Sequence, residues 1–343
     1  MASLAQLKGT MVLTILIAVA FFSAFLAILM ALLQIQPLFA VFGALIFIFF
    51  QYLIGPSLVA ISTKLRYLRP GESPWLESVV RDTASRSGVP MPKLAIVPDT
   101  TPNAFTFGHT AGDATLAVHQ GLLERLNQDE VKGVIGHEIG HIRHNDFIVM
   151  TMLSALPLVA YLIARGLFWS SEVEMRTSRK REEGGAALLA AAVISYVTYI
   201  VSLVIVLRLS RLREHFADAF SAYITGSPRS LESALTKIAY GLSLKPEEPN
   251  GARMFYISDP AQSASEVRSI LDRKDRYDLD RDGVLDEREL ELAMEQEAKS
   301  TWQSLNETFM THPPTFKRIL LLREIDEEMK RGTYTFKNAY RYV

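Results

Sequence analysis

The sequence predicts a mainly helical α+β protein in which four transmembrane helices accompany a part with a small β-sheet. Hydrophobic residues make up 49% of the 343-residue chain, and four runs are apolar over the roughly 20 residues that a bilayer core requires. Two short runs of strand-like composition lie between the second and third apolar runs. The polar stretches around them show the spacing of amphipathic helices.

Composition limits the kinds of partner and cofactor. The formal net charge is −1, which argues against nucleic acid as a main partner. The chain has no cysteine, so disulfides and cysteine-ligated metals are excluded. Any metal ion must therefore be held by histidine, aspartate or glutamate. The apolar runs imply a lipid bilayer as one partner.

The four apolar runs form two predicted hairpins. The first two make an N-terminal hairpin domain (10–61), and the last two make a second hairpin (147–207). The first run has no charged residue and is too long for the core of a signal peptide. Buried helices of a soluble core are the alternative. The expected transmembrane helices lie at about 10–33, 38–61, 147–169 and 187–207.

Lysine and arginine residues predict the orientation of these helices. They gather directly after the second and fourth runs, so the polar parts at 62–146 and 208–343 should face the cytoplasm, in a multi-pass protein of the cell membrane. One loop disagrees, because the third and fourth runs are joined through Arg176, Arg179, Lys180 and Arg181. Incomplete crossing by the second hairpin therefore stays open.

The polar parts show a regular order of elements. An amphipathic helix at 73–88 precedes strand-like runs at 93–99 and 114–123, with the segment NAFTFG between the two runs. A helix follows from Asn127, an expected N-cap residue with acidic residues in the next turn. The second polar part is mostly helical in pattern.

The segment HEIGH, at 137–141, has the spacing of a metal site. Residues four apart lie on one face of a helix, so His137 and His141 can offer two imidazole nitrogens to one ion. Glu138 stands beside them as a general base. An amphipathic helix with ordinary surface histidines is the alternative.

A catalytic zinc usually takes a third protein ligand. His144 shares the face of His137 but lies about 10 Å further along the helix axis, so we expect an interfacial role for it. Glu214 is a better third ligand. Asp218 lies on the same helical face as Glu214 and is placed to orient a ligand histidine.

Five segments resemble the HtpX-like integral membrane zinc metalloproteases, relatives of the type I CAAX prenyl protease: GVPMPKLAIV, PNAFTFG, HEIGHIRHND, SRLREHFADAFSAYITG and THPPTFKRI. The resemblance implies a zincin-like catalytic domain with one zinc ion per chain. It implies that His137, His141 and Glu214 bind the zinc, and that Glu138 is the base for attack of water on a peptide bond.

The same resemblance implies further site residues. Asn103 and Ala104 would lie on an edge strand that pairs with an extended protein or peptide substrate, an arrangement that suits broad specificity. His312 and Arg318 would also belong to the site, with His312 steadying the tetrahedral intermediate. Simple turns are the alternative for the segments around Asn103 and His312.

The segment DLDRDGVLDERE, at 278–289, departs from that family pattern and resembles an EF-hand loop inserted at about 263–300. It predicts a calcium ion held by oxygen ligands, because the acidic residues and a turn-forming glycine take the expected loop positions. A solvated acidic turn is the alternative. The predicted calcium ligands are Asp278, Asp280, Asp282, the carbonyl of Val284, Asp286 and Glu289.

Together these features predict a membrane-embedded zinc endopeptidase that cleaves membrane or misfolded proteins at the cytoplasmic face. A prenyl-peptide protease is one alternative, but four spans are too few for a large intramembrane chamber. A non-catalytic membrane adaptor regulated by calcium is the other, and the intact Glu138 argues against it. No feature of the sequence predicts an oligomeric state.

Overall fold

The computed structural model divides into two compact units. We call the residues Lys8–Gly55 and Ile148–Leu209 the helical unit, and the rest of the described chain, mainly Pro56–Phe147 and the residues from Ser210 onward, the sheet unit. The described residues are 4–33, 37–177, 182–243, 268, 272–279, 293, 296 and 310–334.

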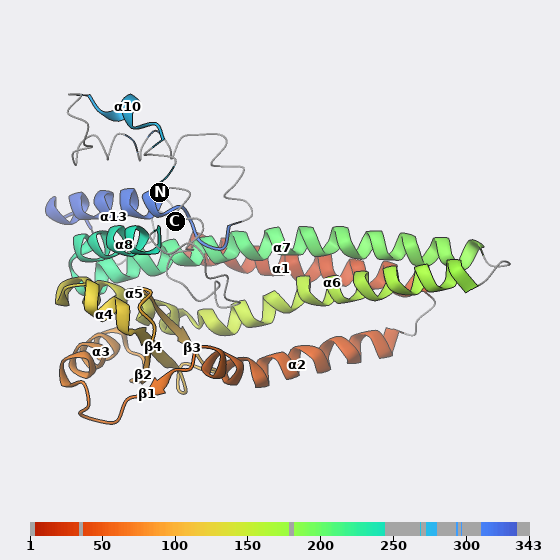
Figure 1. The fold of residues 1–343 in the computed structure, drawn as a ribbon, viewed down its shortest axis with the longest axis horizontal. Coiled ribbons are helices and arrows are strands. Elements are labelled where there is room, and N and C mark those ends of the chain that lie inside the picture. Colours follow the sequence, from red (N-terminus) through yellow and green to blue (C-terminus); the bar gives the residue numbers. More distant parts are fainter. Residues whose placement is uncertain are drawn as a thin grey trace. The chain divides into compact units, whose positions relative to one another are not determined.

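Four long helices supply the helical unit (Figure 1). They are α1 (Leu4–Leu33), α2 (Pro37–Ser62), α6 (Asp146–Thr177) and α7 (Glu182–Thr225). Within the described chain, each contains a stretch long and apolar enough to cross a membrane: Val12–Leu33, Leu45–Ser62, Asp146–Val173 and Gly185–Thr225. The four predicted apolar helices are therefore confirmed, as expected of a multi-pass membrane protein.

The helical unit buries one set of apolar side chains and exposes another. Phe22 and Phe25 of α1 pack in one cluster with Leu153 of α6. By contrast, Leu16 and Phe49 remain 60% and 59% exposed. Exposed apolar surface on this scale suits lipid contact, because a water-soluble protein rarely leaves a large apolar face uncovered.

A four-stranded mixed sheet organises the sheet unit. Its strand order is β1 (Arg66–Tyr67), β2 (Lys93–Val97), β4 (Thr115–His119) and β3 (Ala104–Phe107). The β2 and β4 strands are parallel, and the other neighbours are antiparallel. In the described chain β3 pairs with β4 alone and so forms one edge. The helix expected at 73–88 is α3 (Pro74–Ser87), which ends at the left-handed Gly88.

One predicted strand is too long. The run at 114–123 was expected to be extended throughout, but β4 ends at His119 and helix α4 (Gln120–Arg125) follows at once. The helical turn directs Leu122 into the core, where it is fully buried. Gly121 permits the turn, because a Cβ atom there would lie 2.0 Å from the carbonyl oxygen of Thr100.

The helix α5 (Gln128–His144) is fixed at its N-terminus. Asn127 caps it as predicted, accepting from the backbone of Asp129 and Glu130 in a reciprocal capping box. The Glu130 carboxylate also accepts hydrogen bonds from Ser233 and Lys237 of α8 (Pro228–Ser243). The HEIGH helix is thereby held to its neighbour in its first turn.

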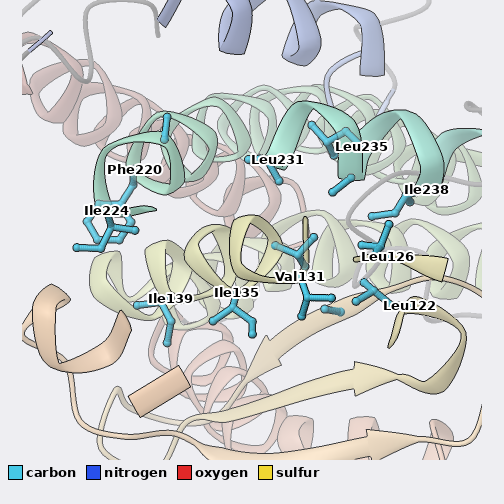
Figure 2. Packing of buried hydrophobic residues seen from close by; sticks show 14 of the residues in the cluster. Leu122, Leu126, Val131, Ile135, Ile139, Phe220, Ile224, Leu231, Leu235 and Ile238 are labelled. Atoms are coloured by element: carbon cyan, nitrogen blue, oxygen red, sulfur yellow. The ribbon is translucent and has the colours of Figure 1, made fainter. Parts of the chain in front are cut away.

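Figure 2 shows how α5 packs in the core. Ile135 and Ile139 lie in one buried cluster with Phe220 of α7 and with Leu231 and Leu235 of α8. The cluster also takes in the apolar face of α13 (Thr315–Lys330), which packs against α8.

Three glycines let α5 approach α7 and α8 closely. A Cβ atom would lie 2.8 Å from the backbone nitrogen of Leu231 at Gly133, and 2.9 Å from Ser221 Oγ at Gly136. At Gly140 it would lie 3.1 Å from the ring of Phe220. Gly133 therefore lies against the backbone of α8, whereas Gly136 and Gly140 lie closest to side chains of α7.

The predicted calcium loop falls largely outside the described residues. Asp278 follows the short helix α10 (Lys274–Tyr277) and is described. The other five predicted ligands (Asp280, Asp282, Val284, Asp286 and Glu289) are not among the described residues. The EF-hand-like insertion therefore stays a prediction.

Candidate active site

The structure brings the two histidines of the HEIGH segment together. His137 and His141 lie one turn apart on α5, and their Nε2 atoms are 3.1 Å from each other. The rings meet edge to face with centroids 4.7 Å apart. His137 is fully buried, whereas His141 is 15% exposed at its side chain. Two imidazole nitrogens thus point at one small volume.

Glu214 of α7 completes a set of three donor atoms. Its Oε2 lies 3.5 Å from His137 Nε2, and its Oε1 lies 3.5 Å from His141 Nε2. Donor atoms about 2.1 Å from a tetrahedral ion are about 3.4 Å apart, so these spacings fit a zinc ion. An oxygen of Glu138 also lies within 4.8 Å of both histidines. We favour Glu214 as the ligand because it is nearer to both.

Asp218 and Arg318 stand behind His137. The Asp218 Oδ1 accepts from His137 Nδ1 at 2.8 Å, and Arg318 binds both Asp218 oxygens at 2.7 and 2.8 Å. Burial alone would lower the pKa of His137, but hydrogen bonds and charges from Asp218 and Glu214 outweigh burial and raise that pKa to about 9. The carboxylates around His137 thus favour a positive charge on or beside its ring.

A second carboxylate, which the sequence patterns did not predict, lies behind His141. His141 Nδ1 lies 2.7 Å from Asp146 Oδ2, and Asp146 Oδ1 pairs with Arg213 of α7. All three side chains are largely buried. The signal in the sequence was the aspartate that follows the HEIGHIRHN segment, but nothing in helical spacing places it near His141.

Glu138 is buried beside the two histidines. Burial raises the pKa of its carboxyl group, and the charges of His141 and His137 and a hydrogen bond from Thr106 offset the rise only in part. Thr106 belongs to β3, so the edge strand and the HEIGH helix meet at this carboxylate. A carboxylate with a raised pKa is a better proton acceptor near neutral pH.

His312 follows Glu214 in the sequence and lies just before α13. Its Nδ1 is 3.3 Å from Glu214 Oε2, and its Nε2 has no hydrogen-bond partner within the described part of the chain. Arg211 donates to the carbonyl oxygen of Met310 at 2.8 Å, which ties this segment to α7. Arg318 Nη1 lies 3.4 Å from the same Glu214 oxygen.

The two remaining predicted site residues lie at the start of the edge strand. Ala104 begins the edge strand β3, and the buried Asn103 immediately precedes it. The carbonyl oxygen of Asn103 accepts from the His119 backbone at 2.9 Å. His144, which we expected at a membrane interface, instead packs edge-on against Phe216 of α7, and burial lowers its pKa to about 4.

Comparison with known proteins identifies the family. The profile of peptidase family M48 matches residues 70–326, well over half of the chain. The chain belongs to peptidase family M48. The match includes the HEIGH helix, Glu214, Asp218, His312 and Arg318. The resemblance stated from the sequence segments is thereby confirmed, and the chain is a protease of this family.

Curated M48 relatives are similar over most of their length. A protease HtpX homolog of Thermococcus sibiricus is 33% identical over 295 residues, which covers 85% of this chain and 87% of the relative. One from Methanothermobacter thermautotrophicus is 41% identical over 207 residues, covering 60% of this chain and 75% of the relative.

A solved structure supports the fold. The crystal structure of S. mikatae Ste24p matches with a TM-score of 0.51 and 17% identity, over 93% of this chain and 67% of that chain. At this identity the likeness is one of fold.

Proposed function

We propose that this M48 protein is a membrane-embedded zinc endopeptidase. One observation carries the proposal: two imidazole nitrogens and one carboxylate lie 3.1 to 3.5 Å apart, with the buried Glu138 beside them. Two histidines and a glutamate form a common protein ligand set of catalytic zinc. His137, His141 and Glu214 are the proposed ligands.

The side chains of the site suit peptide hydrolysis. A bound zinc would supply Lewis acidity, which lowers the pKa of a water molecule to about 7 and polarises a carbonyl group. Glu138 would take the proton from the attacking water and pass it to the leaving amine. His312 would donate from Nε2 to the oxygen that gains charge at the scissile carbonyl. Arg318 would hold Asp218, and through it His137, in place.

The edge strand β3 suits a protein substrate. Because β3 pairs only with β4 in the described chain, its outer edge has backbone groups that an extended peptide can pair with. Backbone pairing does not select side chains, so broad specificity follows. We propose membrane and misfolded proteins as substrates, and Asn103 and Ala104 as the start of the strand that binds them.

Zinc content and proteolysis test this function. Protein purified in detergent should contain about one zinc per chain and should digest casein. Removal of the zinc by a chelator should abolish digestion, and added zinc should restore it. Metal analysis without zinc, or digestion that survives complete removal of the metal, would contradict the proposal.

We propose that the sheet unit faces the cytoplasm, because basic residues follow the second and fourth apolar runs. A tag in the turn at 34–37 should be accessible to protease from outside the cell, whereas a C-terminal tag should be protected. Both tags accessible from one side would overturn the orientation. A tag near Arg179 found inside would remove only the crossing of the second hairpin.

We also propose that the loop at 278–289 binds calcium, with Asp278 and Glu289 as its first and last ligands. Calorimetry on the wild type and on Glu289→Ala measures this. Equal heats in the two proteins would reduce the segment to an acidic turn.

A further inference from the structure

We propose that Asp146 and Arg213 are positioning residues that hold the His141 imidazole in the tautomer and orientation needed for metal binding. This inference rests on the zinc role proposed above for His141. It assigns a task to a buried aspartate and a buried arginine that the proposed mechanism does not use.

The hydrogen bond to Asp146 determines which nitrogen of His141 is available. A neutral imidazole has one N–H donor and one lone-pair nitrogen. Asp146 Oδ2 lies 2.7 Å from Nδ1, so this carboxylate accepts the N–H at Nδ1. The lone pair is then on Nε2, which faces His137 Nε2 at 3.1 Å and Glu214 Oε1 at 3.5 Å.

Arg213 holds Asp146 in turn. It pairs with Asp146 Oδ1, the oxygen that His141 leaves free, and the two side chains are 3% and 6% exposed. A carboxylate this deeply buried requires a countercharge. Arg213 immediately precedes Glu214 on α7. One turn of α7 therefore supplies the proposed ligand Glu214 and also Arg213, which holds the Asp146 carboxylate behind His141.

The backbone at Asn145 makes this contact possible. Asp146 comes five residues after His141, and in a continuous helix it would lie about 140° around the axis from it, at 100° per residue. Asn145 instead ends α5 in the left-handed conformation, with φ 56° and ψ 38°. Asparagine is one of the few residues that adopt this conformation readily. The break lets Asp146 reach back to the His141 ring.

The other histidine has the same arrangement. His137 Nδ1 lies 2.8 Å from Asp218, which binds Arg318 through both oxygens. Each proposed ligand histidine therefore has its own carboxylate and arginine, from separate parts of the chain. The recurrence of this three-part arrangement at one site argues that the His141 set orients a ligand and does not merely fill the core.

Asp146→Asn tests the proposal through metal affinity. Zinc affinity, measured by competition with a chelator, should fall by about 10- to 100-fold, as is typical for loss of a carboxylate behind a ligand. The visible absorption bands of the cobalt(II)-substituted protein should also shift, because they report the ligand field. The matched control is Asp113→Asn, which removes a carboxylate 2.9 Å from His109 Nδ1 outside the site and should change neither measurement.

A second pair of variants separates orientation of His141 from the cost of an unpaired charge. Asp146→Asn leaves the buried Arg213 without its partner carboxylate, whereas the double variant with Arg213→Met does not. If the double variant regains wild-type zinc affinity, the loss came from the unpaired arginine and the inference is wrong. If its affinity stays low and its cobalt bands stay shifted, Asp146 acts on His141.

Failure of this inference differs from failure of the proposed function. A wild-type protein that binds no zinc would overturn the zinc site itself. A wild-type protein that binds one zinc, with an Asp146→Asn variant that binds it equally well and gives an unchanged cobalt spectrum, would overturn only the role of Asp146.

Discussion

Glu138→Gln should lower the rate of casein digestion by about 10²- to 10⁴-fold and leave zinc bound. Glutamine keeps the shape of the side chain but cannot accept the proton of the attacking water. The zinc should stay, because His137, His141 and Glu214 are the nearer donors. Initial rates and metal content of the same preparation measure the two effects together.

Glu130→Gln is the matched control for this change. It makes the same substitution on the same helix, two turns before the site, where the carboxylate binds Ser233 and Lys237 of α8. The control should keep its activity at temperatures where it is folded. Wild-type digestion by Glu138→Gln would refute the mechanism. Loss of zinc from it would make Glu138 a ligand.

Arg318→Met should destabilise the metal-free protein by about 3–5 kcal/mol. The change removes the guanidinium that pairs with Asp218 and lies 3.4 Å from Glu214, and so leaves two buried carboxylates without that cation. Zinc would neutralise Glu214 again, so the loss should be smaller in the zinc-loaded protein. Thermal unfolding in detergent, with zinc and with chelator, measures both values.

Arg229→Met is the control for Arg318. Arg229 also pairs with an aspartate, Asp326, at 2.8 Å, but its side chain is 58% exposed. An exposed ion pair contributes at most about 1 kcal/mol, so this variant should unfold almost as the wild type does. If both variants lose the same small amount of stability, with and without zinc, Arg318 does not stabilise the buried carboxylates of the site.

Periodicity and capping predicted most of the fold. The four apolar helices follow from length and hydropathy alone, and the Asn127 cap follows from side-chain chemistry at the start of α5. The strand β1 was not predicted, because a strand of two residues has no recognisable sequence pattern. The end of β4 was also missed, since the apolar residues of 114–123 suit a strand and a helix equally and only packing of Leu122 decides between them.

The candidate site was predictable where it depends on helical spacing. His137 and His141 share a face, as do Glu214 and Asp218, and the resemblance added His312 and Arg318. Asp146 was not predicted to contact His141, because its position depends on the left-handed backbone conformation of Asn145. A single left-handed residue leaves no periodic pattern in the sequence.

The helix α7 shows a different limit. The change from apolar to polar residues at Arg208 marks the predicted end of the second hairpin at 207. The helix continues from Glu182 to Thr225, because backbone hydrogen bonding does not depend on the polarity of side chains. Glu214 and Asp218 therefore belong to one continuous helix that begins about 30 residues before them.

The glycines of α5 determine how closely this helix approaches its neighbours at the site. Gly136 and Gly140 add no side chain of their own to the contact with α7, where a Cβ atom would lie 2.9 Å from Ser221 Oγ and 3.1 Å from the Phe220 ring, so α5 lies close to the helix that carries Glu214. Any widening of this contact would move Glu214 away from the two histidines, and a displacement of roughly 1 Å is enough to spoil catalytic geometry. Substitution of Gly136 or Gly140 by a larger residue should therefore lower the zinc affinity proposed for this site.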